Sequence, residues 1–226
     1  MPSDISQSIF YNDGQKLTMK INIGTIEYYN SDTDTNDKFE AYKMELKLPS
    51  EHYITNDGIT KRCVLEMQIY HKLISRQNIL INHNFSPINV KEAVVSMLFV
   101  SQESEFGDKF FQEMGITERN KNKEGELNIP NEGESITNIL YPPSSYGSGF
   151  DYLAFEGLMN LIGGNRAMYF YYGSNTAPPC KEDIIWMVYK EPRAISIGQL
   201  EYLSQIMVKQ DKEGNYKGNN RPIIVR

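Results

Sequence analysis

The chain has 226 residues, of which 40% are hydrophobic, with fifteen tyrosines, ten phenylalanines and a formal net charge of −6. This length and composition suit one globular domain with its own core and exclude a disordered chain. Lysine and arginine are scattered rather than interleaved with aromatic residues, so we expect no nucleic-acid surface. No stretch is long and apolar enough to span a bilayer, so we expect a soluble protein with no direct membrane span.

Short strand-like runs separated by turn residues cover most of the chain and predict a mostly β fold. The expected strands are residues 17–23, 25–29, 44–48, 64–70, 77–82, 93–100, 167–172 and 184–189. A short helix is expected over residues 101–114, and residues 152–161 suit either a helix or a strand. The last predicted element is a helix over residues 196–208, with Ser196 as a possible N-cap, Gln199 at the capping-box position and a core-facing stripe of leucine, isoleucine and methionine.

Two polar segments interrupt these elements. Residues 31–37 read SDTDTND, which invites comparison with a calcium loop, but the glycine and distal glutamate of an EF-hand are missing. A plain solvated turn is therefore the favoured interpretation. Residues 115–135 are polar and charged, with the composition of a long surface loop, which in a compact domain is either floppy or a docking surface.

The stretch from Tyr42 to Lys72 holds two strands, Met44 to Leu48 and Val64 to Tyr70, with a turn at Asn56-Asp57-Gly58 between them. Side chains alternate along a strand, so polar and apolar residues take opposite faces. The polar face carries Glu45, Lys47, Glu66, Gln68 and Tyr70, and the other face carries Met44, Leu46, Met67 and Ile69. Taken alone, this pattern favours a solvent-facing polar side, because charged residues on a strand usually meet water.

Three separated segments resemble the alpha-class carbonic anhydrases. The first is Leu48-Pro-Ser-Glu-His52 followed by Leu65-Glu-Met-Gln-Ile-Tyr-His71. The second is Tyr172-Gly-Ser-Asn-Thr-Ala-Pro-Pro-Cys180, continuing through Trp186 to Lys190-Glu-Pro192, and the third is Asn219-Asn-Arg-Pro222. Their order and rough spacing agree with the family from about Phe10 to Arg226.

The resemblance implies a central twisted, largely antiparallel β-sheet with a few short peripheral helices. It also implies a single domain over residues 1–226, with the polar insertion at about 115–135. The family's N-terminal segment with its aromatic cluster has no counterpart, so this domain is expected to be shortened at that end.

The family holds zinc with three histidines, two in an H-x-H pair and the third two residues after the glutamate of L-E-x-H. The matching positions are Glu45, Lys47 and Gln68, and none is histidine. A lysine ammonium brings positive charge to the place of the metal, and an amide oxygen is a weak ligand. The resemblance therefore implies no zinc, no other cofactor and no zinc-bound hydroxide.

Other positions of the family's active site have changed as well. The proton-shuttle histidine is replaced by Gln15, which carries no proton, and the walls of the CO₂ pocket carry Tyr70 and Asn175 in place of valine and leucine. The pair that orients the zinc-bound hydroxide in the family is retained as Glu51 and Thr176. A buried carboxylate and hydroxyl need hydrogen bonds with or without activity, so we interpret this pair as supporting the fold.

The resemblance reverses the preference for a solvent-facing polar side, since this face lines a pocket in the family, and the altered residues suggest a replacement charge scheme. We expect the Lys47 ammonium to lie near the position that the metal takes in the family, hydrogen-bonded to Glu45 and Gln68. In a partly buried pair of this kind the Coulombic attraction roughly offsets the cost of desolvation, but removal of one partner costs about 3–5 kcal/mol of stability. His52 and His71 match positions that look structural in the family.

These features favour a non-catalytic carbonic-anhydrase-like domain, a pseudoenzyme that serves as a structural, protein-binding subunit of a larger assembly. The alternative is a carbonate dehydratase, or another lyase or hydrolase, that uses an altered metal site at Glu45, Glu51 and Gln68. Lys47 argues against such a site. A small-molecule sensor that uses the old cavity ranks last, because Tyr70 narrows that cavity.

Partners are expected to be proteins, which contact the 115–135 loop or the shortened N-terminal side. Cys180 lies where secreted relatives form a disulfide with an N-terminal cysteine, and Cys63 lies elsewhere, so both are expected as free thiols in an intracellular compartment. A mitochondrial or ciliary assembly is compatible with the sequence, and no residue selects either one.

Overall fold

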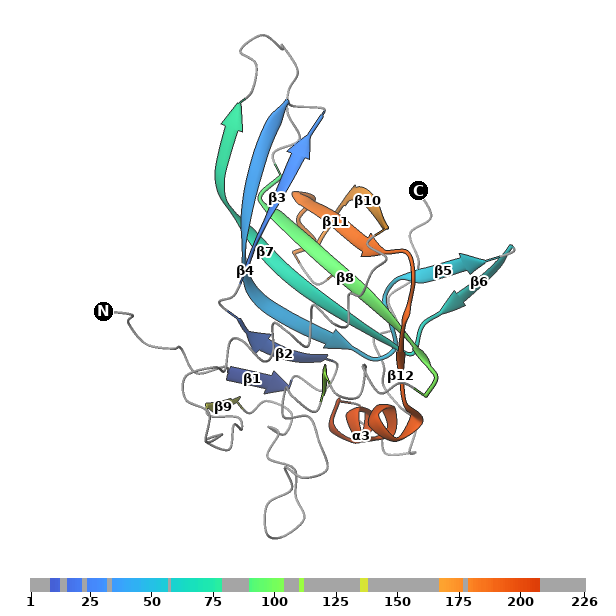
Figure 1. Ribbon diagram of the computed structural model, residues 1–226. Coiled ribbons are helices and arrows are strands. Elements are labelled where there is room, and N and C mark those ends of the chain that lie inside the picture. Colours follow the sequence, from blue (N-terminus) through green and yellow to red (C-terminus); the bar gives the residue numbers. More distant parts are fainter. Residues whose placement is uncertain are drawn as a thin grey trace.

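The structure is a computed structural model that describes residues 9–12, 16–21, 24–31, 34–56, 58–78, 90–103, 110–111, 135–137, 167–176 and 179–207. Within these ranges the strands form one ten-stranded sheet and a separate two-stranded hairpin, and the helix α3 (Ile197–Met207) lies at one end of the sheet (Figure 1). The predicted mostly β fold is confirmed.

Most of the large sheet runs in the order β10-β11-β8-β7-β4-β2-β1-β9, with β12 beside β8 and β3 beside β4. The strands are β1 (Ile9–Asn12), β2 (Lys16–Lys20), β3 (Thr25–Asn30), β4 (Thr35–Lys47), β5 (Tyr53–Asn56), β6 (Ile59–Arg62), β7 (Leu65–Asn78), β8 (Glu92–Ser101), β9 (Ser135–Thr137), β10 (Met168–Gly173), β11 (Ile184–Tyr189) and β12 (Arg193–Ile195). Only β11 and β12 pair in parallel, both with β8, so the described sheet is largely antiparallel as predicted.

The central strand pair β4–β7 forms as expected, but the connection between its strands is more elaborate. That connection carries its own hairpin, β5–β6, which projects from the body of the molecule (Figure 1). Gly58 lies in its turn with φ +76°, a conformation that favours glycine. The separate strand predicted over residues 77–82 is wrong for Gln77 and Asn78, which end β7.

The polar segment 31–37 matches the predicted turn at Ser31 and Asp34 but departs from it over its last three residues. β4 begins at Thr35, and Asp37 is buried within it. The two Asp37 carboxylate oxygens accept hydrogen bonds from Arg76 on β7 at 2.7 and 2.8 Å. This bidentate pair explains how a strand can bury an aspartate.

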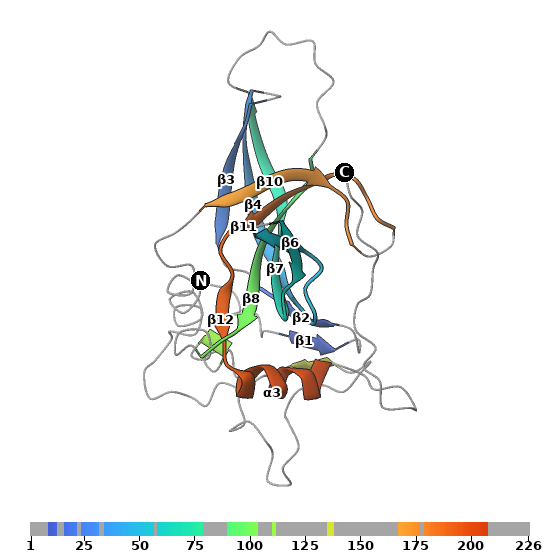
Figure 2. The ribbon, with the colours of Figure 1, turned by 90° about the vertical axis from the view of Figure 1, so that its right-hand side faces the viewer.

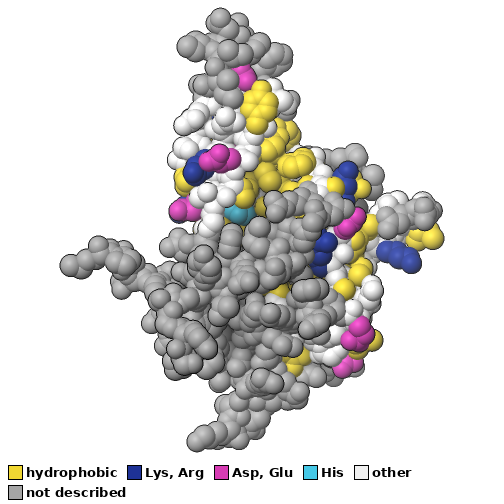
Figure 3. All heavy atoms as spheres, viewed as in Figure 1, with side chains coloured by type: hydrophobic (Ala, Val, Ile, Leu, Met, Phe, Trp, Pro, Cys, Tyr) yellow, Lys and Arg dark blue, Asp and Glu magenta, His cyan; other side chains and the backbone are white. Residues whose placement is uncertain are grey.

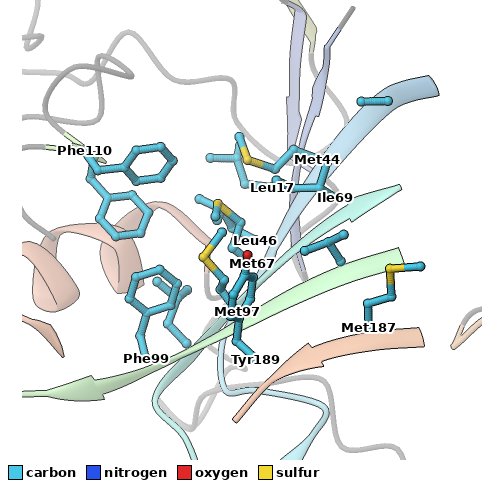
Figure 4. Packing of buried hydrophobic residues seen from close by; sticks show 14 of the residues in the cluster. Leu17, Met44, Leu46, Met67, Ile69, Met97, Phe99, Phe110, Met187 and Tyr189 are labelled. Atoms are coloured by element: carbon cyan, nitrogen blue, oxygen red, sulfur yellow. The ribbon is translucent and has the colours of Figure 1, made fainter. Parts of the chain in front are cut away.

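The main core covers the apolar face of β4, β7 and β8. Figure 4 shows Leu46, Met67 and Met97 on one side of these strands, together with Phe99 and Phe110. The predicted inward set of Met44, Leu46, Met67 and Ile69 is confirmed, since all four belong to this buried cluster. Burial of such side chains is worth about 1.5–3 kcal/mol each.

Helix α3 closes the lower end of this core (Figure 2). The backbone N–H of Gln199 donates to the Ser196 hydroxyl at 3.1 Å, so the predicted N-cap is confirmed. Leu203 and Met207 are buried in the core and Leu200 packs against it, as the predicted stripe requires.

A second, smaller cluster is buried on the opposite face of the sheet. It contains Tyr70, Val94, Leu98 and Trp186. All six residues of β11 are buried, because the sheet is covered on both sides here. The polar side chains of β4 and β7 lie on this second face.

Several predicted features fall outside the described residues. These are Gln15, most of the helix predicted over 101–114, nearly all of the 115–135 loop, residues 152–161 and the motif at 219–222. Cys63 and Cys180 are both free, as predicted. Among the described residues there is no helix with the length and apolar character that a membrane crossing requires.

Candidate functional site

The candidate site begins with the pairing of β4 and β7. Glu45 stands opposite Gln68, and Lys47 stands opposite Glu66. All four side chains are buried, so the solvent-facing side that alternation alone favours is wrong, and the reversal of that preference by the family resemblance is confirmed. A buried face with three charged residues needs specific partners for each, which makes this face the candidate site.

The Lys47 ammonium has the most demanding position, because its side chain is only 2% exposed. Its Nζ donates to Glu51 Oε2 at 2.7 Å and to Thr176 Oγ1 at 2.8 Å. Glu45 Oε2 lies 3.5 Å away as an additional ion-pair partner. The two groups that orient the zinc-bound hydroxide in the resembled family therefore bind a lysine in this chain.

The predicted bond between Lys47 and Gln68 is wrong. Gln68 Nε2 instead donates to Glu51 Oε2 at 3.0 Å and to Glu66 Oε1 at 2.6 Å. Its Oε1 accepts a hydrogen bond from the Tyr70 hydroxyl at 2.8 Å. The amide is held between two carboxylates and a phenol, since its two donors face the acids and its acceptor faces the Tyr70 hydroxyl.

Glu45 is surrounded by lysines. Its Oε1 accepts from Lys16 at 2.8 Å and from Lys43 at 2.9 Å, while Lys47 approaches the other oxygen. Burial alone would raise the pKa of Glu45, but the positive charges of Lys47, Lys16 and Lys43 lower it to about 2. The carboxylate is thus ionised at neutral pH.

Glu66 anchors the segment that follows β4. Its oxygens accept from the backbone N–H groups of Glu51 and His52 at 2.7 and 3.0 Å, and from the Ser96 hydroxyl at 2.7 Å. His52 Nδ1 lies 2.6 Å from Glu66 Oε1. Burial acts to raise the pKa of Glu66, but His52 and the donated hydrogen bonds hold it well below its usual range. This carboxylate fixes Glu51 in reach of Lys47.

The two histidines have different environments. Burial acts to lower the pKa of His52, but the Glu66 carboxylate raises it overall, and His52 Nε2 lies 2.7 Å from the Tyr171 hydroxyl. His71 Nδ1 lies 3.0 Å from the Ile69 carbonyl oxygen, and burial lowers its pKa to about 4. Among the described residues, neither histidine forms a hydrogen bond with Lys47. This fits the structural role predicted for both histidines.

Tyr70 fills the space beside Gln68. Its ring is fully buried and packs edge-on against Trp186 and Tyr42, with ring centroids 6.4 Å apart in both cases. The Lys43 ammonium lies 3.9 Å from the centroid of the Tyr70 ring, in cation–π geometry. Burial raises the pKa of Tyr70 well above its ordinary value, so the phenol stays neutral.

Thr176 reaches Lys47 from the segment after β10. Gly173 at the end of β10 lies against Trp186, where an added Cβ would come within 2.9 Å of the indole ring. Asn175 is half-buried, and its backbone N–H donates to the Lys181 carbonyl at 2.9 Å. The close packing at Gly173 and this turn set the position of the Thr176 hydroxyl.

The sequence interpretation missed Lys16 and Lys43. Lys43 could have been found, because it precedes Glu45 by two residues and so shares its face of β4. Lys16 could not, because its proximity depends on the pairing of β2 with β4, where Lys16 stands opposite Lys47.

The residues present do not fit the zinc that the resembled family implies. A zinc ligand needs a free lone pair, which the Lys47 ammonium lacks while it donates to Glu51 and Thr176, and the Gln68 amide oxygen is a weak ligand that already accepts one hydrogen bond from Tyr70. The described parts of the chain hold no group of three or more His, Cys, Asp or Glu side chains suited to a metal ion.

Comparison with known proteins agrees with the resemblance. A model of eukaryotic-type carbonic anhydrases matches residues 3–225. Mouse carbonic anhydrase 4 is 37% identical over 70 residues, which cover 29% of this chain and 23% of the mouse protein. The putative carbonic anhydrase 5 of Caenorhabditis elegans is 49% identical over 56 residues, which cover 23% of this chain and 17% of the worm protein. The matched stretches thus span less than a quarter of these relatives.

Solved structures share the fold. The alpha-carbonic anhydrase of Photobacterium profundum superposes with a TM-score of 0.58 over 96% of this chain and 73% of its own, at 20% identity. The Thermovibrio ammonificans alpha-carbonic anhydrase, in complex with sulfanilamide, gives a TM-score of 0.56 over 90% of this chain and 69% of its own, at 21% identity. At this level of identity the likeness concerns the fold.

Proposed function

Since this chain belongs to the eukaryotic-type carbonic anhydrase family, we propose that it is a non-catalytic member that serves as a structural, protein-binding subunit of a larger assembly. The observation that carries the non-catalytic role is the position of the Lys47 ammonium. It is buried and donates to Glu51 and Thr176, the two groups that would orient a zinc-bound hydroxide.

The chemistry of the surrounding residues supports the same conclusion. Carbonic anhydrase activity needs a metal that lowers the pKa of bound water to near neutral. Glu45 is neutralised by three lysines, and Gln68 is fixed by its own hydrogen bonds. These contacts leave the cluster poorly suited to hold the metal that would lower the pKa of a bound water molecule.

The alternative, a lyase or hydrolase with an altered metal site at Glu45, Glu51 and Gln68, has less support. The three ammonium groups of Lys16, Lys43 and Lys47 already offset the three carboxylates of Glu45, Glu51 and Glu66. No excess negative charge is left in this cluster to attract a divalent cation. The Gln68 oxygen, which that site would need, accepts from Tyr70 and so offers only its second lone pair, as a weak amide ligand.

Exposed aromatic side chains support the protein-binding role. Tyr169 and Phe170 on β10 are 59% and 53% exposed, and aromatic residues are enriched at protein interfaces. Figure 3 shows further hydrophobic side chains gathered on the upper part of the face that it displays. Neighbouring residues on a strand point to opposite faces, so Tyr169 and Phe170 offer one exposed aromatic side chain on each side of β10.

The catalytic half of the proposal is tested by CO₂ hydration. The purified protein, dialysed against zinc and then freed of unbound metal, is assayed by stopped flow beside an active carbonic anhydrase. We expect the rate of the buffer alone and no stoichiometric metal. Stoichiometric zinc together with hydration well above the buffer rate would overturn the non-catalytic role.

The partner half is tested by native fractionation of cell extracts. We expect the protein to migrate in a complex larger than its own 26.0 kDa. A double variant, Tyr169→Ser with Phe170→Ser, is expected to shift it toward the free form. The matched control is Ile59→Ser, because Ile59 is 58% exposed on the β5–β6 hairpin. Migration of the natural chain as a free monomer would contradict the subunit role.

A further inference from the structure

The three oxygen atoms around the Lys47 ammonium converge on one point. Glu51 Oε2 lies 2.7 Å from Nζ, Thr176 Oγ1 lies 2.8 Å away, and Glu45 Oε2 lies 3.5 Å away. They come from three places in the chain, namely strand β4, the segment after it and the segment after β10. The fold thus assembles an oxygen-lined position around a positive charge.

That position has the properties of a cation site. Two of its three oxygens are carboxylate oxygens, and the side chains of Glu45 and Glu51 are only 2% and 8% exposed. Carboxylates with so little contact with water need a compensating positive charge close by. Carboxylate and hydroxyl oxygens are also the donors that hard cations prefer.

We propose that Lys47 supplies a built-in cation to a site formed by Glu45, Glu51 and Thr176, and that this site accepts an external cation once the Lys47 side chain is shortened. The inference deepens the proposed function, because it states what the altered site holds. It differs from the metal site considered in the sequence, since Thr176 takes part and Gln68 does not.

The neighbouring contacts explain why the natural chain excludes an external cation. Lys16 and Lys43 occupy Glu45 Oε1, and the Gln68 amide donates to the same Glu51 oxygen that accepts from Lys47. With Lys47 present, the three ammonium groups already offset the carboxylates of Glu45, Glu51 and Glu66. With Lys47 shortened, Glu51 Oε2, Glu45 Oε2 and the Thr176 hydroxyl lose their shared partner.

The test is thermal unfolding of Lys47→Ala with added cations. Propylammonium matches the atoms that the substitution removes, from Cγ to Nζ, and zinc tests for a metal ion at the same site. We expect either cation, at about ten times its Kd, to raise the Tm of Lys47→Ala by about 3–6 °C. We expect no rise for the natural chain, nor for Lys43→Ala, which loses a different partner of Glu45.

A folded Lys47→Ala protein that responds to neither cation would overturn the inference, as would a natural chain stabilised equally by both. If Lys47→Ala fails to fold, a second comparison replaces it. Lys47→Met should have a lower Tm than Lys47→Met combined with Glu51→Gln, because the double variant buries one carboxylate fewer. An equal or lower Tm for the double variant would overturn the inference.

The outcomes for this inference and for the proposed function can be told apart. CO₂ hydration by the zinc-loaded natural chain would remove the non-catalytic role, whatever Lys47→Ala does. Indifference of a folded Lys47→Ala protein to cations would remove the built-in cation and leave the non-catalytic role in place.

Discussion

The two faces of the β4–β7 strand pair are both buried, but they are stabilised in different ways. One face packs Met44, Leu46, Met67 and Ile69 into the main core, and the other holds Glu45, Lys47, Glu66 and Gln68 in a network of ion pairs and hydrogen bonds. Apolar packing is non-directional and tolerates changes of similar volume. A buried polar network depends on every partner, so it loses far more when one member is removed.

The largest expected effect separates two neighbouring residues on these faces. Lys47→Met keeps much of the volume but leaves Glu51 and Glu45 without their cation, so we expect a loss of about 3–5 kcal/mol in unfolding free energy. Leu46→Met on the apolar face should cost less than about 1.5 kcal/mol. Urea denaturation measures both, and equal losses would break the comparison.

Acid should weaken the polar face at a defined pH. The neighbouring lysines lower the folded-state pKa of Glu45 to about 2 from its ordinary value of 4.5, so its contribution is present above about pH 4.5 and is lost as pH falls toward 2. The shift corresponds to about 3 kcal/mol. Urea denaturation at several pH values should show this loss in the natural chain and a smaller one in Glu45→Gln; identical acid profiles would argue against the lysine cluster.

The two histidines provide a further test, since strand alternation places His71 on the side of Met67 and Ile69, while His52 belongs to the polar network. Burial lowers the pKa of His71 to about 4, so its neutral form is lost, and stability falls, as pH drops from 6.5 toward 4. The pKa of His52 is raised, so its stabilising contribution is present below 6.5 and is lost as pH rises through the folded-state value. An NMR titration should give His71 a pKa below the ordinary histidine value and His52 a pKa above it. Shifts of both pKa values in the same direction would contradict the assignment.

The smallest effect should come from the edge of the polar network. Lys43 also pairs with Glu45, but its side chain is 22% exposed and Lys16 binds the same oxygen. Lys43→Met should therefore cost only about 0.5–1 kcal/mol. A loss as large as that of Lys47→Met would show that burial does not govern the energetics of this cluster.

The sequence supported the β fold and the central strand pair well, because period-two alternation from Met44 to Leu48 and from Val64 to Tyr70 is a local signal. It placed Glu45, Lys47 and Gln68 on one polar face, and in the structure Gln68 stands opposite Glu45. The partners of Lys47 were harder to predict, because Thr176 lies 129 residues away and Glu51 lies beyond the end of the strand. Alternation also could not reveal that the polar face is buried, since burial depends on what covers the sheet.

The burial of Asp37 shows the same limit. A run of polar residues at 31–37 indicates a turn locally, but its last three residues begin β4, where Asp37 makes a bidentate contact with Arg76 on β7. Long-range ion pairs of this kind override local composition, and a single sequence does not identify the partner.

The most direct measurement is an anomalous diffraction map, collected at the zinc edge, from crystals of the natural chain soaked in zinc. We predict no anomalous peak among Glu45, Glu51 and Thr176, with Lys47 Nζ within hydrogen-bond distance of Glu51 and Thr176. A strong peak at that position, with the Lys47 side chain turned away from both, would contradict the central claim that a lysine takes the place of the metal.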